Sequence, residues 1–287
     1  GRYIISREAG RCTNYSLPYI MNNSAMVFGT VNFCDKGALR YNFVGIGGEG
    51  TKLEWLTHYF NTMPIEQLEI LFDKIFLKIL NPWYGQPVKK EIQQYKDHDP
   101  RLTFFPNLCE VAEKELEISA DDKYVVLDGI DIEQINPYWF LKHEYKRREE
   151  RTVDYNVSVC HGDLNMQNIL LDKDMNVYLI DFSETRPRAV VSDFARLEAI
   201  FMVESALMDT PKNIKKTIDM VSVFYDHNLI DKKPSFIWKG DVPGIVRRNV
   251  SLSYKMREYA DRSLPESKSI VLYYIAMLEW TLPIVCY

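Results

Sequence analysis

One stretch of the sequence, residues 159–184, constrains the fold more than any other. Two short apolar runs, residues 169–171 and 177–180, flank the polar residues 173–176. Apolar runs of this length on either side of a polar turn predict a β-hairpin. A polar loop enters its first strand, and an acidic residue follows its second. We therefore expect Asp163, Asn168 and Asp181 to lie near one end of this hairpin.

These three side chains have the chemistry of a magnesium site. Carboxylate and amide oxygens are hard ligands, and Mg²⁺ is usually held by one or two carboxylates together with phosphate oxygens. A further carboxylate nearby can accept the proton of a hydroxyl group. The pattern therefore indicates chemistry on a phosphate-bearing ligand.

The order of these residues resembles the catalytic loop of protein kinases. His161, Asp163 and Asn168 follow the pattern H-x-D-x-x-x-x-N, and Asp181 ends the next strand. The versions His-Gly-Asp and Ile-Asp-Phe are closer still to the aminoglycoside phosphotransferase and choline kinase branch. In that branch the residue after Asp-Phe varies, and here it is Ser183.

The resemblance implies a role for each matched residue. Asp163 would be the catalytic base, and Asn168 and Asp181 would bind Mg²⁺. His161 would brace the loop, and Asp193 would hydrogen-bond the loop backbone and fix its shape. A neighbouring cation favours the charged form of a carboxylate, so Asp163 is expected to stay ionised at neutral pH.

The resemblance also implies a fold. This is an α+β, protein kinase-like two-lobe fold, in which a mostly helical large lobe carries the catalytic β-hairpin. We expect residues 1–46 to be a partial or truncated β small lobe, 47–50 a hinge, and 51–287 the large lobe. Residues 86–155 would be an insertion before the catalytic loop, and insertions at this point often shape the acceptor site in such enzymes.

A glycine-rich cluster precedes the first helical pattern of the proposed large lobe. By its place in the chain, Gly45, Ile46, Gly47 and Gly48 would form the hinge whose backbone holds adenine. A plain loop into a helix N-terminus is a second interpretation. A phosphate loop is a third, since helix N-termini attract anions.

The residues before this cluster depart from the family pattern. A complete member carries a phosphate-covering loop, a strand lysine and a helix glutamate upstream of the hinge, and no glycine-rich loop followed by a lysine strand is evident here. Lys36 fits a solvated turn better than a phosphate-pairing lysine. The missing parts either lie upstream or are reduced. The start at Gly1 without an initiator Met favours a part of a longer polypeptide.

Periodicity predicts the remaining elements. Residues 1–47 read as strands and turns, with an antiparallel hairpin formed by 25–33 and 39–46. Apolar residues recurring at three and four predict a long helix over 64–80. Residues 89–97 read as a short polar helix. Further helices are expected over 192–208, 211–228, 244–262 and 265–287.

Composition narrows the function classes. The formal net charge is −5, which argues against general nucleic-acid binding. No apolar run reaches the length of a membrane span, and five scattered cysteines without metal-ligand spacing indicate reduced thiols in the cytoplasm.

The predicted function is ATP-dependent transfer of the γ-phosphate to a hydroxyl of a small molecule such as an aminoglycoside, amino alcohol or sugar. A protein hydroxyl is not excluded as the acceptor. One alternative is a catalytically weak kinase-like module that binds nucleotide or a partner within a larger protein. A metal-dependent phosphohydrolase or nuclease is a third, although it needs more acidic ligands than this hairpin offers.

Overall fold

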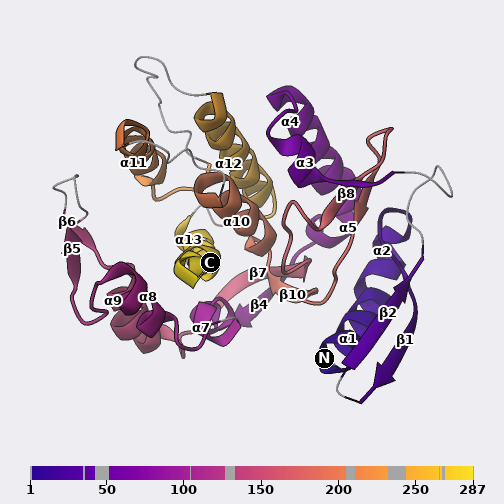
Figure 1. The fold of residues 1–287 in the computed structure, drawn as a ribbon, viewed down its shortest axis with the longest axis horizontal. Helices are drawn as coiled ribbons and strands as arrows, with labels where there is room; N and C mark the ends of the chain where they lie inside the picture. The colour runs from indigo at the N-terminus through magenta and orange to yellow at the C-terminus, as the bar shows by residue number, and fades with distance from the viewer. Residues whose placement is uncertain are drawn as a thin grey trace. The chain divides into compact units, whose positions relative to one another are not determined.

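The protein has a mixed α+β fold, mainly helical, with small antiparallel sheets (Figure 1). The computed structural model describes residues 2–34, 36–42, 52–103, 105–126, 133–204, 211–231, 244–264, 266 and 269–286. The chain forms two compact units, each built from two separate ranges. Unit 1 comprises Gly1–Val88 and Asn156–Leu197, and unit 2 comprises Lys89–Tyr155 and Glu198–Tyr287. The coarse α+β prediction is thus confirmed, whereas the expected hinge at 47–50 lies outside the described residues.

Unit 1 begins with helices, and the prediction of strands and turns for its first residues was wrong. The helical elements there are α1 (Arg2–Arg11), η1 (Cys12–Ser16), α2 (Leu17–Ile20) and η2 (Met21–Asn23). Glu8, Cys12, Ser16 and Ile20 are buried at intervals of four residues, which is one face of a helix. Three of these four residues are polar or small, so the buried face left no apolar periodicity in the sequence.

The hairpin predicted from 25–33 and 39–46 is present, its second strand begins earlier than predicted, and residues 43–46 lie outside the described residues. Strand β1 (Val27–Phe33) pairs with β2 (Lys36–Tyr41) in antiparallel register, with Phe33 opposite Lys36. Lys36 therefore opens a strand and is not a turn residue. One face of β2 packs towards α1, because a Cβ added at Gly37 would lie 2.8 Å from Cγ1 of Ile5.

The hairpin that carries the motif forms as predicted. Strands β8 (Ile169–Leu171) and β9 (Val177–Leu179) pair in antiparallel register, and β3 (Glu54–Trp55) extends the sheet beside β8. The carboxylate of Asp172 caps the turn by accepting hydrogen bonds from the backbone N–H groups of Asp174 and Asn176. This is a turn role that a short acidic side chain fills readily.

Buried apolar residues of the long predicted helix contribute to the core of unit 1. The helix is present as α4 (Ile65–Lys74) and the π-helical turn η3 (Ile75–Ile79), with Leu68, Leu71, Phe72, Ile75 and Phe76 buried. The remaining elements of unit 1 are α3 (Leu56–Phe60), α5 (Asn81–Tyr84) and β10 (Arg186–Ala189). Strand β10 pairs with the end of β7 (Val153–Cys160), where Arg186 lies opposite Cys160.

Unit 2 is mostly helical. Its elements up to residue 148 are β4 (Val88–Ile92), α6 (Gln94–Asp97), α7 (Pro100–Thr103), α8 (Leu108–Leu116), β5 (Tyr124–Val126), β6 (Glu133–Ile135), α9 (Pro137–Trp139), η4 (Phe140–Tyr145) and η5 (Lys146–Arg148). The helix predicted over 89–97 is therefore wrong in its first half, which is the strand β4. This strand carries three successive charged residues and is mostly exposed, so no apolar periodicity distinguished a strand from a helix. Asn136 caps the start of α9, because its Oδ1 accepts from the N–H of Tyr138 at 2.9 Å.

The later helices follow the prediction more closely. They are α10 (Ser192–Ala199), η6 (Ile200–Glu204), α11 (Pro211–Tyr225), α12 (Gly244–Arg262), α13 (Val271–Thr281) and η7 (Leu282–Cys286). Two buried apolar clusters hold unit 2 together. One gathers residues of α8, η4 and α13, including Leu108, Leu141 and Ile275. The other joins η6, α11 and α12 through Met202, Phe224 and Val250.

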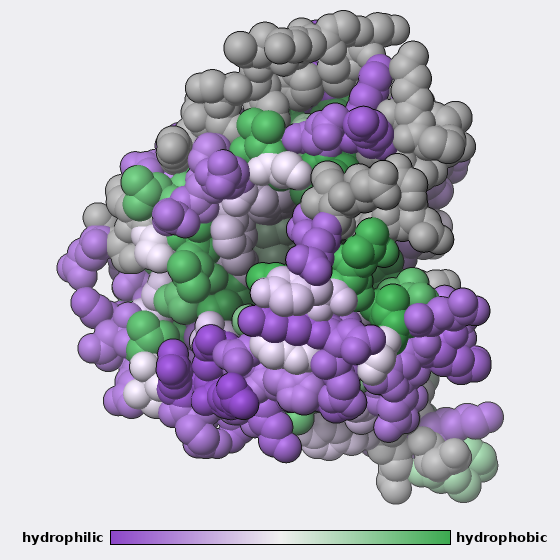
Figure 2. Space-filling view, turned by 90° about the vertical axis from the view of Figure 1, so that its left-hand side faces the viewer, coloured by the Kyte–Doolittle hydropathy of each residue, from purple (hydrophilic) through white to green (hydrophobic). Residues whose placement is uncertain are grey.

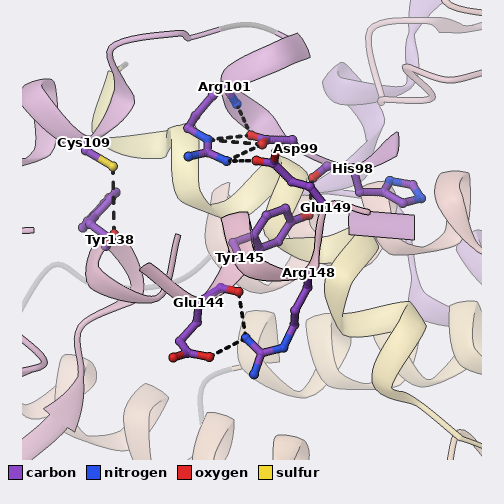
Figure 3. A network of polar contacts seen from close by, with 9 residues as sticks. All are labelled: His98, Asp99, Arg101, Cys109, Tyr138, Glu144, Tyr145, Arg148 and Glu149. Carbon is purple, nitrogen blue, oxygen red and sulfur yellow. Dashed lines mark hydrogen bonds and ion pairs between the residues drawn. The ribbon is translucent and has the colours of Figure 1, made fainter. Parts of the chain in front are cut away.

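A polar network orders the part of unit 2 between residues 98 and 149 (Figure 3). Arg101 donates from Nε and Nη2 to the Asp99 carboxylate and from Nη2 to Glu149 at 2.9 Å. The Tyr145 hydroxyl donates to the His98 carbonyl at 2.8 Å. These groups bond one another at short range, which is how buried polar groups are normally satisfied. We assign the network to folding.

The surface on the side of the β5–β6 hairpin is mainly hydrophilic, with smaller hydrophobic areas between the polar ones (Figure 2). Tyr124, Val126 and Ile135 of this hairpin are exposed. Within the residues that the structure describes, no helix is both long and apolar enough to span a bilayer.

Candidate functional site

The carboxylate of Asp193 organises the loop that enters the hairpin. Its Oδ2 accepts from the His161 N–H at 2.6 Å, and its Oδ1 accepts from the Gly162 N–H at 2.9 Å. The Tyr84 hydroxyl also donates to Oδ2. Burial and the nearby carboxylate raise the pKa of Tyr84 well above its ordinary value, so this hydroxyl keeps its proton. The predicted hydrogen bonds from Asp193 to the loop backbone are therefore confirmed.

Two backbone groups of Ile180 join the loop to the end of strand β9. Its N–H donates to the carbonyl of Asn168 at 3.1 Å, and its carbonyl lies 3.0 Å from Nε2 of His161. Because a carbonyl can only accept, Nε2 of His161 carries the proton in this contact. His161 is fully buried and so braces the loop from inside. These bonds bring Asn168 and Asp181 to the same end of the hairpin, since each is attached to Ile180 or adjacent to it.

The side chains of Asn168 and Asp181 are oriented by the backbone around them. Nδ2 of Asn168 donates to the Asp163 carbonyl at 2.8 Å, which leaves its Oδ1 as a possible ligand. Asp181 has a φ of 60°, and its Oδ1 accepts from the Ser183 N–H at 3.2 Å. A left-handed backbone is uncommon outside glycine, although aspartate adopts it more readily than most residues, and Cys34, Glu117 and Met175 also have a positive φ.

The donor set fits a magnesium ion that also binds phosphate. Asn168 and Asp181 offer one amide and one carboxylate oxygen, and Mg²⁺ commonly takes few protein ligands together with phosphate oxygens and water. Among the described residues, no group of three or more His, Cys, Asp and Glu side chains is gathered as for a metal held by protein alone. A structural metal cage is therefore not the arrangement seen in this part of the chain.

Asp163 lies in the loop and faces one cation of the protein. Its Oδ1 is 3.5 Å from Nε of Arg196 on α10. Burial raises the pKa of Asp163, and the charge of Arg196 opposes this shift. The sequence predicted that a bound cation keeps this carboxylate ionised. Arg196 acts in that same direction, against the effect of burial.

Asn165 is a site residue that the sequence prediction missed. Its Oδ1 accepts from the N–H groups of Gln167 at 2.8 Å and Asn168 at 3.1 Å, which closes the turn before β8. An asparagine that accepts from the N–H groups two and three residues later is a known turn former, so the signal was present in the sequence.

Glu8 is the second residue that was missed. It is buried on α1, and burial together with the charge of Asp181 raises its pKa to about 7. No sequence signal pointed to it, because its helix was not predicted. The predicted adenine-binding residues Gly45, Ile46, Gly47 and Gly48 lie outside the described residues.

Comparison with known proteins gives one partial match. The profile of the family described as "Ternary complex associated domain 9" matches residues 108–223, which is less than half of the chain. This range includes the loop and hairpin from His161 to Asp193. A search of curated proteins gave no match.

Proposed function

We propose that the protein is an ATP-dependent phosphotransferase of the protein kinase-like fold, acting on a hydroxyl group of a small molecule. The observation that carries the proposal is the bonding of Asp193 to the His161 and Gly162 N–H groups. Together with the Ile180 contacts, it holds Asp163, Asn168 and Asp181 at one end of a hairpin. The same residues matched the motif of the aminoglycoside phosphotransferase and choline kinase branch.

In this proposal each side chain has a defined task. Asp163 accepts a hydrogen bond from the acceptor hydroxyl and takes its proton as the phosphoryl group transfers. Asn168 and Asp181 hold Mg²⁺, which when bound offsets negative charge on the phosphate oxygens. Asp193, His161 and Asn165 keep the loop in shape by the hydrogen bonds described above. In this chemistry positioning and electrostatic stabilisation supply most of the rate.

In this proposal Glu8 would be the helix glutamate that the family pattern carries upstream of the hinge. It lies on a helix before the strands β1 and β2 and feels the charge of Asp181. In the proposed site Glu8 would stand at the nucleotide end, where a cation of the protein or ligand would keep it ionised.

Calorimetric titration with ATP, with and without Mg²⁺, tests the proposal. We expect magnesium-dependent binding by the wild-type chain and its loss in Asp181→Asn. Asp163→Asn should retain binding and lose phosphoryl transfer in a screen of aminoglycosides, amino alcohols and sugars. Wild-type turnover by Asp163→Asn would overturn the assignment of the base.

A second candidate is a kinase-like module that binds nucleotide or a partner without efficient catalysis. It is favoured by the family match, because the name of that family refers to association in a ternary complex and the match includes the loop. Magnesium-dependent ATP binding that no hydroxyl compound converts into transfer would favour this candidate.

A further inference from the structure

Helix α1 contacts the segment that follows Asp181 through charged side chains. Arg7 forms an ion pair with Glu184 through its Nη2 atom. Arg11 donates from Nη1 to the carbonyl of Ser183, and the same atom lies 3.5 Å from Oε2 of Glu184. Arg7 and Arg11 are one helical turn apart, so both guanidinium groups reach the segment from one face of α1.

The backbone of Glu184 also contacts the loop that contains Asp163. Gly162 has a φ of +85°, and a Cβ added there would lie 2.3 Å from the carbonyl oxygen of Glu184 and 2.8 Å from its carbonyl carbon. The backbone of Glu184 thus lies directly against the Gly162 backbone. The neighbouring Thr185 hydroxyl donates to the His161 carbonyl at 3.0 Å, which ties the same two segments together.

Asp181 is therefore bracketed by fixed contacts on both sides. Before it, Ile180 is bonded to His161 and Asn168. After it, Ser183 and Glu184 are held by the two arginines of α1. Contacts on both sides thus restrict the left-handed backbone of Asp181.

We propose that Arg7, Arg11 and Glu184 are positioning residues that fix the backbone of Asp181 and the Gly162 loop, so that α1 controls the metal site. This inference rests on the proposed function in one respect, namely that Asp181 is a metal ligand. The three residues act through the backbone and do not ligate the ion. Outer residues of this kind commonly change metal affinity by about 10- to 100-fold when they are removed.

Metal affinity tests this role more directly than activity does. We suggest Mn²⁺ as the probe, with the fraction bound measured by electron paramagnetic resonance in the absence of nucleotide. The variants are Glu184→Gln, which keeps the shape of the side chain, and the double variant Arg7→Ala with Arg11→Ala. We expect both to weaken Mn²⁺ binding by about 10-fold or more. Replacing Arg11→Ala by Arg11→Lys in the double variant should recover part of the Mn²⁺ affinity, because the lysine places a cation beside Glu184.

The matched control is Lys89→Ala. It removes an exposed ion pair with Glu266 in unit 2, so it should leave Mn²⁺ binding unchanged. Circular dichroism and the thermal midpoint of each variant separate positioning from folding. A role in folding alone would lower the midpoint of Glu184→Gln without weakening Mn²⁺ binding by the folded protein.

The possible results distinguish the two proposals. No Mn²⁺ binding by the wild-type chain would overturn the metal site, and this inference with it. Wild-type binding that is abolished by Asp181→Asn but unchanged in Glu184→Gln and in the double arginine variant would overturn this inference alone. If the double variant does not fold, Glu184→Gln decides the matter, because it alters no residue of α1.

Discussion

At the scale of single residues, two interactions across long sequence separations shape the surroundings of the candidate site. The Tyr84 hydroxyl donates to the Asp193 carboxylate, and the charge of Asp181 contributes to the raised pKa of Glu8. Tertiary packing alone brings these groups together, so no local pattern in the sequence predicted Tyr84 or Glu8. The motif side chains themselves, from Asp163 to Asp193, were predicted, because they share one short stretch of the chain.

Gly162 offers the first test at this scale. Gly162→Ala should destabilise the protein by about 2 kcal/mol or more, because a Cβ would meet the backbone of Glu184 and the residue has a left-handed φ. Urea denaturation followed by circular dichroism measures the change. The control is Gly10→Ala on α1, where an added Cβ has no atom within 4 Å. That change should stabilise the helix by about 0.5–1 kcal/mol. Equal effects at both positions would contradict the geometry described for Gly162.

Glu8 provides a prediction about pH. Its pKa is raised from 4.5 to about 7, so the folded state binds this proton more tightly than the unfolded state does. The stability that the folded state gains by binding this proton is present in full below pH 4.5 and is lost as the pH rises through about 7. Glu8→Gln should therefore stabilise the protein at pH 8, by roughly 2–3 kcal/mol relative to wild type, and much less at pH 5.

Urea denaturation in the presence of EDTA at pH 5 and pH 8 measures this difference for Glu8→Gln. EDTA is needed because a bound cation would favour the ionised form of Glu8. The control is Glu91→Gln on β4, where the side chain is exposed and the change should be close to zero at both pH values. A gain in stability for Glu8→Gln that is the same at pH 5 and pH 8 would rule out titration of Glu8 as its source.

At the scale of elements, prediction succeeded where apolar periodicity was strong. The hairpin β8–β9, the helix α4 with η3, and α12 follow patterns of buried apolar residues. The prediction failed for helix α1 and the turn after it, because their buried residues Glu8, Cys12 and Ser16 are polar or small. The prediction failed for strand β4 because its successive, exposed charged residues show neither the helix period nor the strand period. Burial of polar groups is decided by their partners, which a sequence pattern does not contain.

Strand β1 has an exposed apolar surface, which leads to a prediction about self-association. Among the described residues it pairs only with β2, and Phe28, Val31 and Phe33 are exposed on it. An apolar edge strand without charged residues tends to pair with other chains. Val31→Lys should therefore reduce self-association, with a change in stability within about 0.5 kcal/mol.

Light scattering over a range of protein concentrations measures the self-association. The matched control is Leu102→Lys, because Leu102 is 66% exposed, nearly the same as the 67% of Val31, but lies on helix α7. We expect this control to leave self-association unchanged. A reduction of equal size in both variants would attribute the effect to net charge and not to the strand edge.

At the scale of the whole molecule, the division of the chain was not predictable from composition. Each unit contains two ranges that are far apart in sequence, and the chain passes between units at residues 88–89, 155–156 and 197–198. These points fall inside the regular elements β4, β7 and α10. Domain prediction from composition depends on linkers, and such crossings have none.

Several helices around unit 2 meet at a buried ion pair. Arg257 and Glu198 are fully buried, with Nη2 of Arg257 2.8 Å from Oε1 of Glu198. The Tyr273 hydroxyl donates to Oε2 of Glu198 at 2.7 Å, and the guanidinium carbon lies 4.0 Å from the ring centroid of Phe224. The pair thus joins residues from α10, α11, α12 and α13. Charges buried in this way are tolerated only while each has its partner.

Removing one partner should therefore cost more than removing both charges. We expect Arg257→Met to lower the free energy of unfolding by about 3–5 kcal/mol, because it leaves the Glu198 carboxylate buried without its cation. Adding Glu198→Gln should recover about 2 kcal/mol, since the amide still accepts from Tyr273 and carries no charge. A double-mutant cycle in urea, with Glu198→Gln alone as its fourth member, measures this coupling. Strict additivity of the two substitutions would show that the charges do not stabilise one another, and packing of the helices around Phe224 would then account for the stability of unit 2.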